Sequence, residues 1–236
     1  MEEHYLTEDI VIKTNKTYYK DKLVKKHNWH LILGELGWEK LSKQWIKKLN
    51  KLNNPYPNNS LYGALECGDD GDCLFHCIAY SLNTVGDNMY DNQDIRNIVA
   101  DSISQEQFKD IITIYRSMKD LDDFDEEWDP YEIDTLSKFK EELSKTGNSY
   151  WGDHLLLQLI MEKFNINVLI LSQNEFLDIY DIYPTFSSYK KEQNTIILIH
   201  ENEQHFKLLG RFNDVMITNF THLTMPLEIK RLFNLQ

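Results

Sequence analysis

The sequence predicts an α+β protein, with helices in the first part of the central region and strands in the last. Three observations carry this prediction. Apolar residues recur at helical spacing from Cys73 onward, and residues 168–171 form a short apolar run typical of a buried strand. Residues 195–200 form a strong strand pattern, which turns over residues 201–204 and pairs back from His205. Helices followed by a terminal hairpin are typical of the α+β class.

The N-terminal region has its own pattern. Residues 9–19 alternate enough to predict a short hairpin that turns near Asn15 and Lys16. Residues 38–52 predict an amphipathic helix with lysines on one face. The opposite face is an apolar stripe of Trp38, Leu41, Trp45, Leu49 and Leu52. Residues 53–59 are rich in Asn and Pro and break regular structure. We therefore expect an N-terminal appendage over residues 1–58, with its stripe packed on a catalytic body over residues 59–236.

Further helices and strands are expected in the body. Residues 73–83 predict a helix, and Asn92 or Asp94 could cap a second helix whose inner face is Ile95, Ile98, Val99 and Ile103. Residues 107–118 and 132–143 also have helical patterns, residues 147–149 are a loop, and residues 153–163 predict another helix. Residues 176–183 are expected to form an edge strand.

Composition limits the classes of protein that the chain can represent. With 236 residues and 42% hydrophobic content, one domain with a full core is expected. No apolar run is long enough to span a bilayer, and residues 1–4 do not resemble a signal peptide. The three cysteines are crowded into residues 67–77, which is not a disulfide framework and favours a reducing, cytosolic compartment. We expect neither a membrane partner nor a cofactor.

The charge is strongly and unevenly negative. The net charge of −13 argues against a nucleic-acid binder and is compatible with a basic protein partner. Residues 1–52 carry about +4 and the rest about −17, with an acidic peak over residues 120–129. Both regions can also be ordinary solvated surface.

Residues 69–76 are the most informative stretch, because they place Cys73 where a glycine turn meets a helix. Gly71 can take a positive φ, so the chain can turn sharply before Cys73. A cysteine in the first helical turn lies at the positive end of the helix dipole, which favours thiolate over thiol. Free backbone N–H groups there can hold a developing oxyanion. This pattern indicates a nucleophile.

Two other interpretations of this stretch are a structural cysteine and a zinc site. A cysteine that opens an apolar helix can be a small buried hydrophobic residue. Cys67, Cys73, His76 and Cys77 could also suggest zinc, but one helix would then have to supply three ligands. No metal site is therefore predicted.

A nucleophilic cysteine needs an imidazole within hydrogen-bonding reach. His205 is the best candidate, because it opens a strand directly after a tight turn and so lies at the rim of the sheet. His200, at the other end of that turn, is the alternative. His76 lies one turn after Cys73 on the same helix and would be a poor base.

Three separated motifs together resemble the ovarian-tumour (OTU) family of cysteine proteases. Asp70, Gly71, Cys73 and Phe75 resemble its Asp-Gly-x-Cys-x-Phe nucleophile motif. The Trp-Gly-Asp run at residues 151–153 resembles the family's Trp-Gly helix start, and residues 196–199 followed by His205 and Phe206 resemble its last strands. The similarity covers roughly residues 60–210. It implies the OTU fold, a small central sheet flanked by helices.

The resemblance implies a deubiquitinase that cleaves isopeptide bonds at the C-terminal glycine of ubiquitin in a eukaryotic or host cytosol. Cys73 would be the nucleophile, His205 the general base and then acid, and Asp70 the orienting residue. The loop that includes Gly71 and Asp72 would form the oxyanion hole, and Trp151, Gly152 and Phe206 would line or support the channel for the Gly-Gly end of ubiquitin. The partner would be ubiquitin, polyubiquitin or a ubiquitin-like modifier, and a viral or bacterial origin, with action on a host, is as compatible as a cellular one.

One position departs from the family pattern. Many members carry Asp or Asn two residues after the catalytic histidine, where this chain has Lys207, which cannot accept a hydrogen bond. Asp70 is then the first choice for the orienting residue, with Asn202, Asn213 or a backbone carbonyl as alternatives. The departure also leaves open two other functions: a ubiquitin-binding module without turnover, or a cysteine hydrolase or acyltransferase with another acyl substrate.

Overall fold

The computed structural model describes residues 3–53, 61–68, 71–86, 88–124, 126–183 and 189–235. Within these residues the main sheet has the strand order β5-β6-β10-β9-β7-β8, with β11 paired to β10 and β12 to β9. Its strands are β5 (Trp38–Lys40), β6 (Tyr62–Glu66), β7 (Ile166–Asn174), β8 (Ile179–Ile182), β9 (Asn194–Glu201), β10 (His205–Asn213), β11 (Val215–Ile217) and β12 (Asn219–Phe220). β7 and β9 run parallel and the other pairs antiparallel. The sheet and its helices form the predicted α+β architecture.

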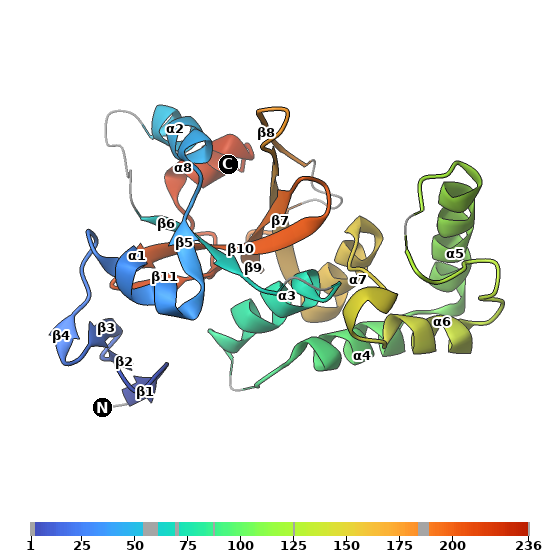
Figure 1. The fold of residues 1–236 in the computed structure, drawn as a ribbon, viewed down its shortest axis with the longest axis horizontal. Helices are drawn as coiled ribbons and strands as arrows, with labels where there is room; N and C mark the ends of the chain where they lie inside the picture. The colour runs from blue at the N-terminus through green and yellow to red at the C-terminus, as the bar shows by residue number, and fades with distance from the viewer. Residues whose placement is uncertain are drawn as a thin grey trace.

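Helices cover both faces of this sheet (Figure 1). One core joins the sheet to α3 (Cys73–Asn83), α4 (Asn92–Ser102) and α7 (His154–Phe164), and a second core lies against α2 (Lys43–Leu52) and α8 (Leu227–Leu232). α4 leads away from the sheet to α5 (Gln105–Asp120) and α6 (Leu136–Leu143), which form a helical arm at the right of Figure 1. No helix in the described ranges is both long and apolar enough to cross a membrane.

The N-terminal residues form a small separate sheet in the order β1-β2-β3-β4. Its strands are β1 (Glu3–Tyr5), β2 (Ile10–Lys13), β3 (Lys16–Tyr19) and β4 (Lys22–Leu23). Thr14 and Asn15 both have positive φ, which is the backbone of a type I′ hairpin turn, so the predicted hairpin is confirmed one residue earlier than expected. A short helix α1 (Trp29–Ile32) and a 3₁₀ turn η1 (Leu33–Leu36) then lead to the main sheet.

The helix predicted over residues 38–52 is wrong in its first part. Trp38 belongs to β5 and pairs with Leu65, and the helix begins only at Lys43, after the side chain of Ser42 accepts the N–H of Trp45. Gly37, with φ +87°, turns the chain between η1 and β5. The N-terminal region therefore gives an edge strand to the main sheet, and Trp29 and Trp38 are buried in the same core as α3. The expected linker over residues 53–59 lies outside the described residues except for Asn53.

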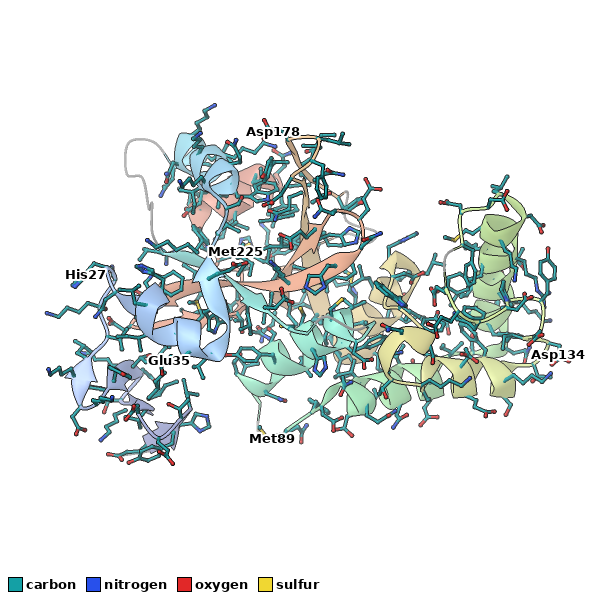
Figure 2. All side chains as sticks on the ribbon, viewed as in Figure 1. His27, Glu35, Met89, Asp134, Asp178 and Met225 are labelled. Carbon is teal, nitrogen blue, oxygen red and sulfur yellow. The ribbon has the colours of Figure 1, made fainter. Side chains whose placement is uncertain are left out.

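The other predicted elements are confirmed with shifted ends. Asp91, rather than Asn92 or Asp94, caps α4 in a reciprocal capping box with Asp94. α6 begins at Leu136 after Thr135, later than predicted, and residues 147–149 form a 3₁₀ turn, η2 (Gly147–Ser149). The expected edge strand over residues 176–183 is shorter, because residues 175–178 form the turn of the β7–β8 hairpin. Figure 2 labels Asp178 at this turn, where its carboxylate accepts a hydrogen bond from Gln44 of α2.

Candidate active site

Cys73 is the first residue of α3, as the sequence predicts. Its sulfur accepts the backbone N–H of Phe206 at 3.4 Å, so the N-terminus of α3 meets the start of β10. Apolar residues of α3 bury the helix beneath the sheet: Leu74, Phe75, Cys77 and Ile78 are fully buried. Cys73 itself is 2% exposed, so its sulfur lies at the bottom of the site rather than on the surface.

His205 is the first residue of β10, directly before the Phe206 N–H that bonds to Cys73, and its imidazole interacts with the Cys73 side chain. This interaction is the largest cause that raises the pKa of His205 to about 9; burial opposes it, and the charges of Cys73 and Glu66 add to it. His200, the alternative base, stacks on the ring of Phe206 at 4.4 Å. Burial lowers the pKa of His200 to about 4, so this imidazole is neutral at pH 7. The sheet therefore brings His205, rather than His200, to Cys73.

Glu66 contacts the other side of the His205 imidazole. Its Oε1 lies 2.5 Å from Nε2 of His205, and its Oε2 lies 3.5 Å from Nζ of Lys207. Sequence reasoning missed Glu66. The available signal is modest: Glu66 is the first charged residue after the apolar run at residues 61–65, so it marks the end of a strand close to the motif of Cys73.

The loop before Cys73 is fixed by a buried arginine that sequence reasoning also missed. Arg96 of α4 has no exposed surface and bonds to the carboxylate of Asp72 through Nε at 2.6 Å and Nη2 at 2.5 Å. Its Nη2 also donates to the carbonyls of Gly71 at 3.2 Å and Tyr150 at 2.7 Å. The C=O and N–H of one trans peptide point in opposite directions. Because the Gly71 carbonyl faces Arg96, the N–H of Asp72 points away from it.

Gly71 is required for a different reason from the one predicted. Its φ does not lie in the left-handed region, which Gly68, three residues earlier, occupies at φ +111°. A Cβ on Gly71 would instead lie 2.5 Å from the carbonyl oxygen of Gly147 and 3.1 Å from Trp151. The Gly147 N–H donates to Asp72 Oδ2 at 2.7 Å, and the Asn148 side chain accepts the N–H of Gly71 at 3.3 Å. Close packing against the 147–151 loop, rather than a turn, therefore excludes a side chain here.

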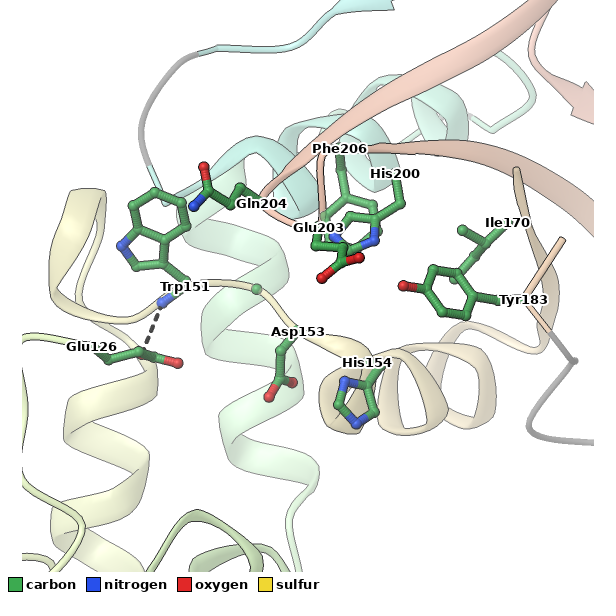
Figure 3. Close-up of a pocket in the computed structure, with 11 residues that line it drawn as sticks. Glu126, Trp151, Asp153, His154, Ile170, Tyr183, His200, Glu203, Gln204 and Phe206 are labelled. Atoms are coloured by element: carbon green, nitrogen blue, oxygen red, sulfur yellow. Dashed lines mark hydrogen bonds between the residues drawn. The ribbon is translucent and has the colours of Figure 1, made fainter. Parts of the chain in front are cut away.

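A pocket of about 700 Å³ is lined by Phe206, whose N–H bonds to Cys73, and by Trp151 (Figure 3). It is lined by Glu126, Trp151, Gly152, Asp153, His154, Ile170, Tyr183, His200, Glu203, Gln204 and Phe206. Cys73 and His205 do not line it themselves, but their direct contacts and chain neighbours do. Phe206 donates to the Cys73 sulfur, and a Cβ on Gly152 would lie 2.7 Å from Leu74. The predicted residues Trp151, Gly152 and Phe206 thus line one pocket that ends beside the pair.

The Trp151 wall of this pocket is attached to the helical arm. Asp153 caps α7 through Oδ1 and accepts the hydroxyl of Tyr115, on α5, at 2.8 Å through Oδ2. Glu126 accepts the backbone N–H of Trp151 at 3.1 Å (dashed in Figure 3) and the indole N–H of Trp128 at 2.6 Å. Burial raises the pKa of Glu126 to about 7, although both N–H groups oppose this rise. The pocket therefore has aromatic walls and carboxylates from α7, the arm and the 201–204 turn.

The structure brings Cys73, His205, Gly71, Asp72, Trp151, Gly152 and Phe206 to one region. Asp70 lies outside the described residues. The alternative orienting residues are engaged elsewhere: Asn202 accepts the N–H of Glu175 through Oδ1, and Asn213 lies at the far end of β10.

A cysteine at a helix N-terminus, with a histidine of the adjoining strand beside it, is the arrangement of a cysteine hydrolase. The sequence model of the family described as OTU-like cysteine protease matches residues 68–206, which is more than half of the chain. The chain therefore belongs to the OTU-like cysteine protease family and has its fold. No curated protein sequence matches the chain.

Several solved structures are similar to this chain. An OTU deubiquitinase from Wolbachia pipientis wMel has a TM-score of 0.46 at 19% identity and covers 69% of this chain and 94% of its own. The OTUD1 OTU domain has a TM-score of 0.44 at 12% identity and covers 80% of this chain and 100% of its own. The viral OTU domain protease from Dera Ghazi Khan virus has a TM-score of 0.40 at 13% identity and covers 66% of this chain and 84% of its own.

Proposed function

We propose that the protein is a deubiquitinase, a cysteine protease that hydrolyses the isopeptide bond between ubiquitin's C-terminal glycine and a lysine ε-amine. The observation that carries the proposal is the placement of His205 beside Cys73, at the N-terminus of α3, where the N–H of the next residue, Phe206, bonds to the Cys73 sulfur, inside the segment that matches the family. A thiol paired with an imidazole at this position has a nucleophile and a proton acceptor in contact.

The reaction follows from the positions of these groups. His205 takes the thiol proton, and the Cys73 sulfur attacks the glycine carbonyl to form a tetrahedral oxyanion. Backbone N–H groups at the start of α3, including that of Asp72, stabilise this charge as it develops. His205 then protonates the leaving ε-amine, which leaves a thioester between ubiquitin and Cys73. Water, deprotonated by His205, attacks the thioester and restores the thiol.

The pocket beside the pair suits the C-terminal tail of ubiquitin. The tail ends in Gly-Gly and carries arginines upstream of that end. Trp151 and Phe206 border the part of the pocket that leads to Cys73, where residues without side chains fit. Glu203, on the 201–204 turn, adds an exposed carboxylate to the lining, which favours cationic side chains. The charge of about −17 beyond residue 52 is consistent with a basic partner.

The test is reaction with full-length ubiquitin that carries a cysteine-reactive group at its C-terminus, followed by intact mass. We expect a mass increase of one ubiquitin in the wild type and in Cys67→Ala, and none in Cys73→Ala. Cys67 is the matched control, since it is a free cysteine that lies near the site without a proposed role. Cleavage of a ubiquitin chain is then measured for the wild type and His205→Ala, and we expect loss of turnover in the variant.

Three outcomes contradict the proposal. An adduct that persists in Cys73→Ala would assign the nucleophile elsewhere. Ubiquitin binding without an adduct or cleavage in a folded wild type would favour a binding module. A protein whose Cys73 reacts with small thiol reagents but not with the ubiquitin reagent would point to another acyl substrate, such as a different ubiquitin-like modifier.

A further inference from the structure

The register of β6 and β10 gives His205 a carboxylate partner that its own strand lacks. Two residues after His205 on the same face of β10 lies Lys207, which is a cation and can only donate hydrogen bonds. Lys207 pairs with Glu66 across the two strands. From this position Glu66 reaches diagonally to the start of β10, where its Oε1 meets Nε2 of His205 at 2.5 Å. The acceptor therefore comes from the neighbouring strand.

Lys207 fixes the other oxygen of the same carboxylate. Its ammonium lies 3.5 Å from Glu66 Oε2, 3.0 Å from Glu39 Oε1 on β5 and 2.9 Å from Glu201 Oε2 on β9. The Lys207 side chain is only 14% exposed, so these charges interact more strongly than on an open surface. Burial by itself lowers the pKa of Lys207, but the bonds to Glu201 and Glu39 raise it overall, so the cation is retained.

We propose that Glu66 is the residue that positions the His205 imidazole for catalysis, and that Lys207 holds the Glu66 carboxylate in place. This inference rests on the proposed function. An acceptor on Nε2 keeps the proton of the neutral ring on that nitrogen, which leaves the lone pair of Nδ1 for the Cys73 thiol. When His205 takes the thiol proton, the same carboxylate stabilises the imidazolium.

The charges around His205 favour its protonated form. Among the described residues, Cys73 faces the ring from α3 and Glu66 from β6, while Glu201 and His200 belong to β9, on the other side of β10. Lys207 with Glu39, Glu66 and Glu201 has a combined charge of −2, so the lysine does not cancel the carboxylates. The pKa of His205, raised to about 9, agrees with this arrangement.

The experiment separates the role of Glu66 from the identity of the substrate. Alkylation of Cys73 by iodoacetamide is followed by peptide mass from pH 5 to 10 in the full chain, and kcat and KM are measured on ubiquitin with a C-terminal fluorogenic amide. The variants are Glu66→Gln, Glu66→Ala, Lys207→Met and the double variant Glu66→Ala/Lys207→Met. Glu39→Gln is the matched control, because it removes a carboxylate from Lys207 without touching His205. Thermal unfolding of each variant checks that it folds.

Loss of the Glu66 charge lowers the pKa of His205, so the thiolate–imidazolium pair should persist over a narrower range of pH. In Glu66→Gln we expect the upper inflection of the alkylation rate against pH, where the imidazolium loses its proton and the thiolate remains, to move down by about one pH unit. We expect kcat to fall roughly 10- to 100-fold in Glu66→Ala, less than the full 10²–10⁴-fold that acid–base catalysis contributes because His205 itself is retained, with KM within about twofold. Glu66→Gln, which keeps an acceptor oxygen, should recover part of this loss.

Lys207→Met should lower kcat by less than Glu66→Ala, and the double variant should be no worse than Glu66→Ala alone, because both residues act through one carboxylate. The alkylation rate of Glu39→Gln against pH should follow that of the wild type. An unchanged alkylation profile in Glu66→Gln, or additive losses in the double variant, would overturn the inference and leave Asp70 as the candidate. If the wild type does not cleave ubiquitin but Glu66→Gln still moves the profile, the proposed function fails and the positioning role stands.

Discussion

The guanidinium of Arg96 binds the carboxylate of Asp72, the residue directly before Cys73, and both side chains are almost fully buried. Arg96 also donates to the carbonyls of Gly71, Leu143 and Tyr150, and its Cζ lies 4.0 Å from the centre of the Phe75 ring. One side chain on α4 therefore ties together α6, the Trp151 loop and the loop that opens α3.

Replacement of Arg96 should lower the free energy of unfolding, because the Asp72 carboxylate loses its buried partner. Arg96→Met leaves the Asp72 charge buried without its partner, so we expect the free energy of unfolding to fall by about 3–5 kcal/mol. Arg96→Lys keeps the charge but loses the planar fork, and it should recover only part of this loss. Urea unfolding measures both effects. A loss below about 1 kcal/mol in Arg96→Met would mean that the pair does not hold the loop.

The pH-dependence of stability should contain a contribution from Glu126. Its pKa in the folded protein is raised from 4.5 to about 7, so between these values the native state retains a proton that the unfolded state has lost. Stability from this group is present below pH 4.5 and is lost as the pH rises toward 7. Relative to Glu126→Gln, the wild type should lose on the order of 2 kcal/mol over this range.

Urea unfolding at several pH values between 4 and 8 measures this difference. The exposed neighbour Glu127 is the matched control, and Glu127→Gln should follow the wild type. If the free energies of unfolding of the wild type and Glu126→Gln changed in parallel with pH, the Glu126 carboxylate would not be desolvated in the folded protein.

A methyl group at Gly71 should impair the site more than the fold. Because it would lie 2.5 Å from a backbone oxygen of Gly147, the loop before Cys73 or the 147–151 loop must move. We expect Gly71→Ala to cost about 1–3 kcal/mol of stability and to slow adduct formation with the ubiquitin reagent by at least about tenfold. Gly34→Ala is the control, since a Cβ there meets nothing within 4 Å. Equal rates for Gly71→Ala and the wild type would contradict the close packing of the two loops.

Much of the fold was predictable because its signals are local. The helical spacing after Cys73, the capping carboxylate of Asp153 and the turn before His205 each depend on residues close in sequence. Trp38 was misassigned for the same reason: its spacing to Leu41 and Trp45 fits a helix, and only its pairing with Leu65 across β6 makes it a strand residue.

The missing parts of the site depend on contacts that no local pattern contains. Glu66 meets His205 because β6 pairs with β10, and that register follows from the packing of the whole sheet. Arg96 stands in a polar part of α4 and would normally be assigned to the surface. Its burial becomes understandable once Asp72 and the three carbonyls are seen around it.

The position of β10 in the sheet also governs when the protein can become reactive during its synthesis. The ribosome delivers Cys73 and its helix early, whereas His205 and the strand that carries it follow roughly 130 residues later. At 5–20 residues per second this interval is roughly 7–26 s, during which the nascent chain has a thiol but no imidazole to activate it. The order of the elements along the chain thus leaves the thiol of the nascent protein without its proton acceptor until β10 has been made.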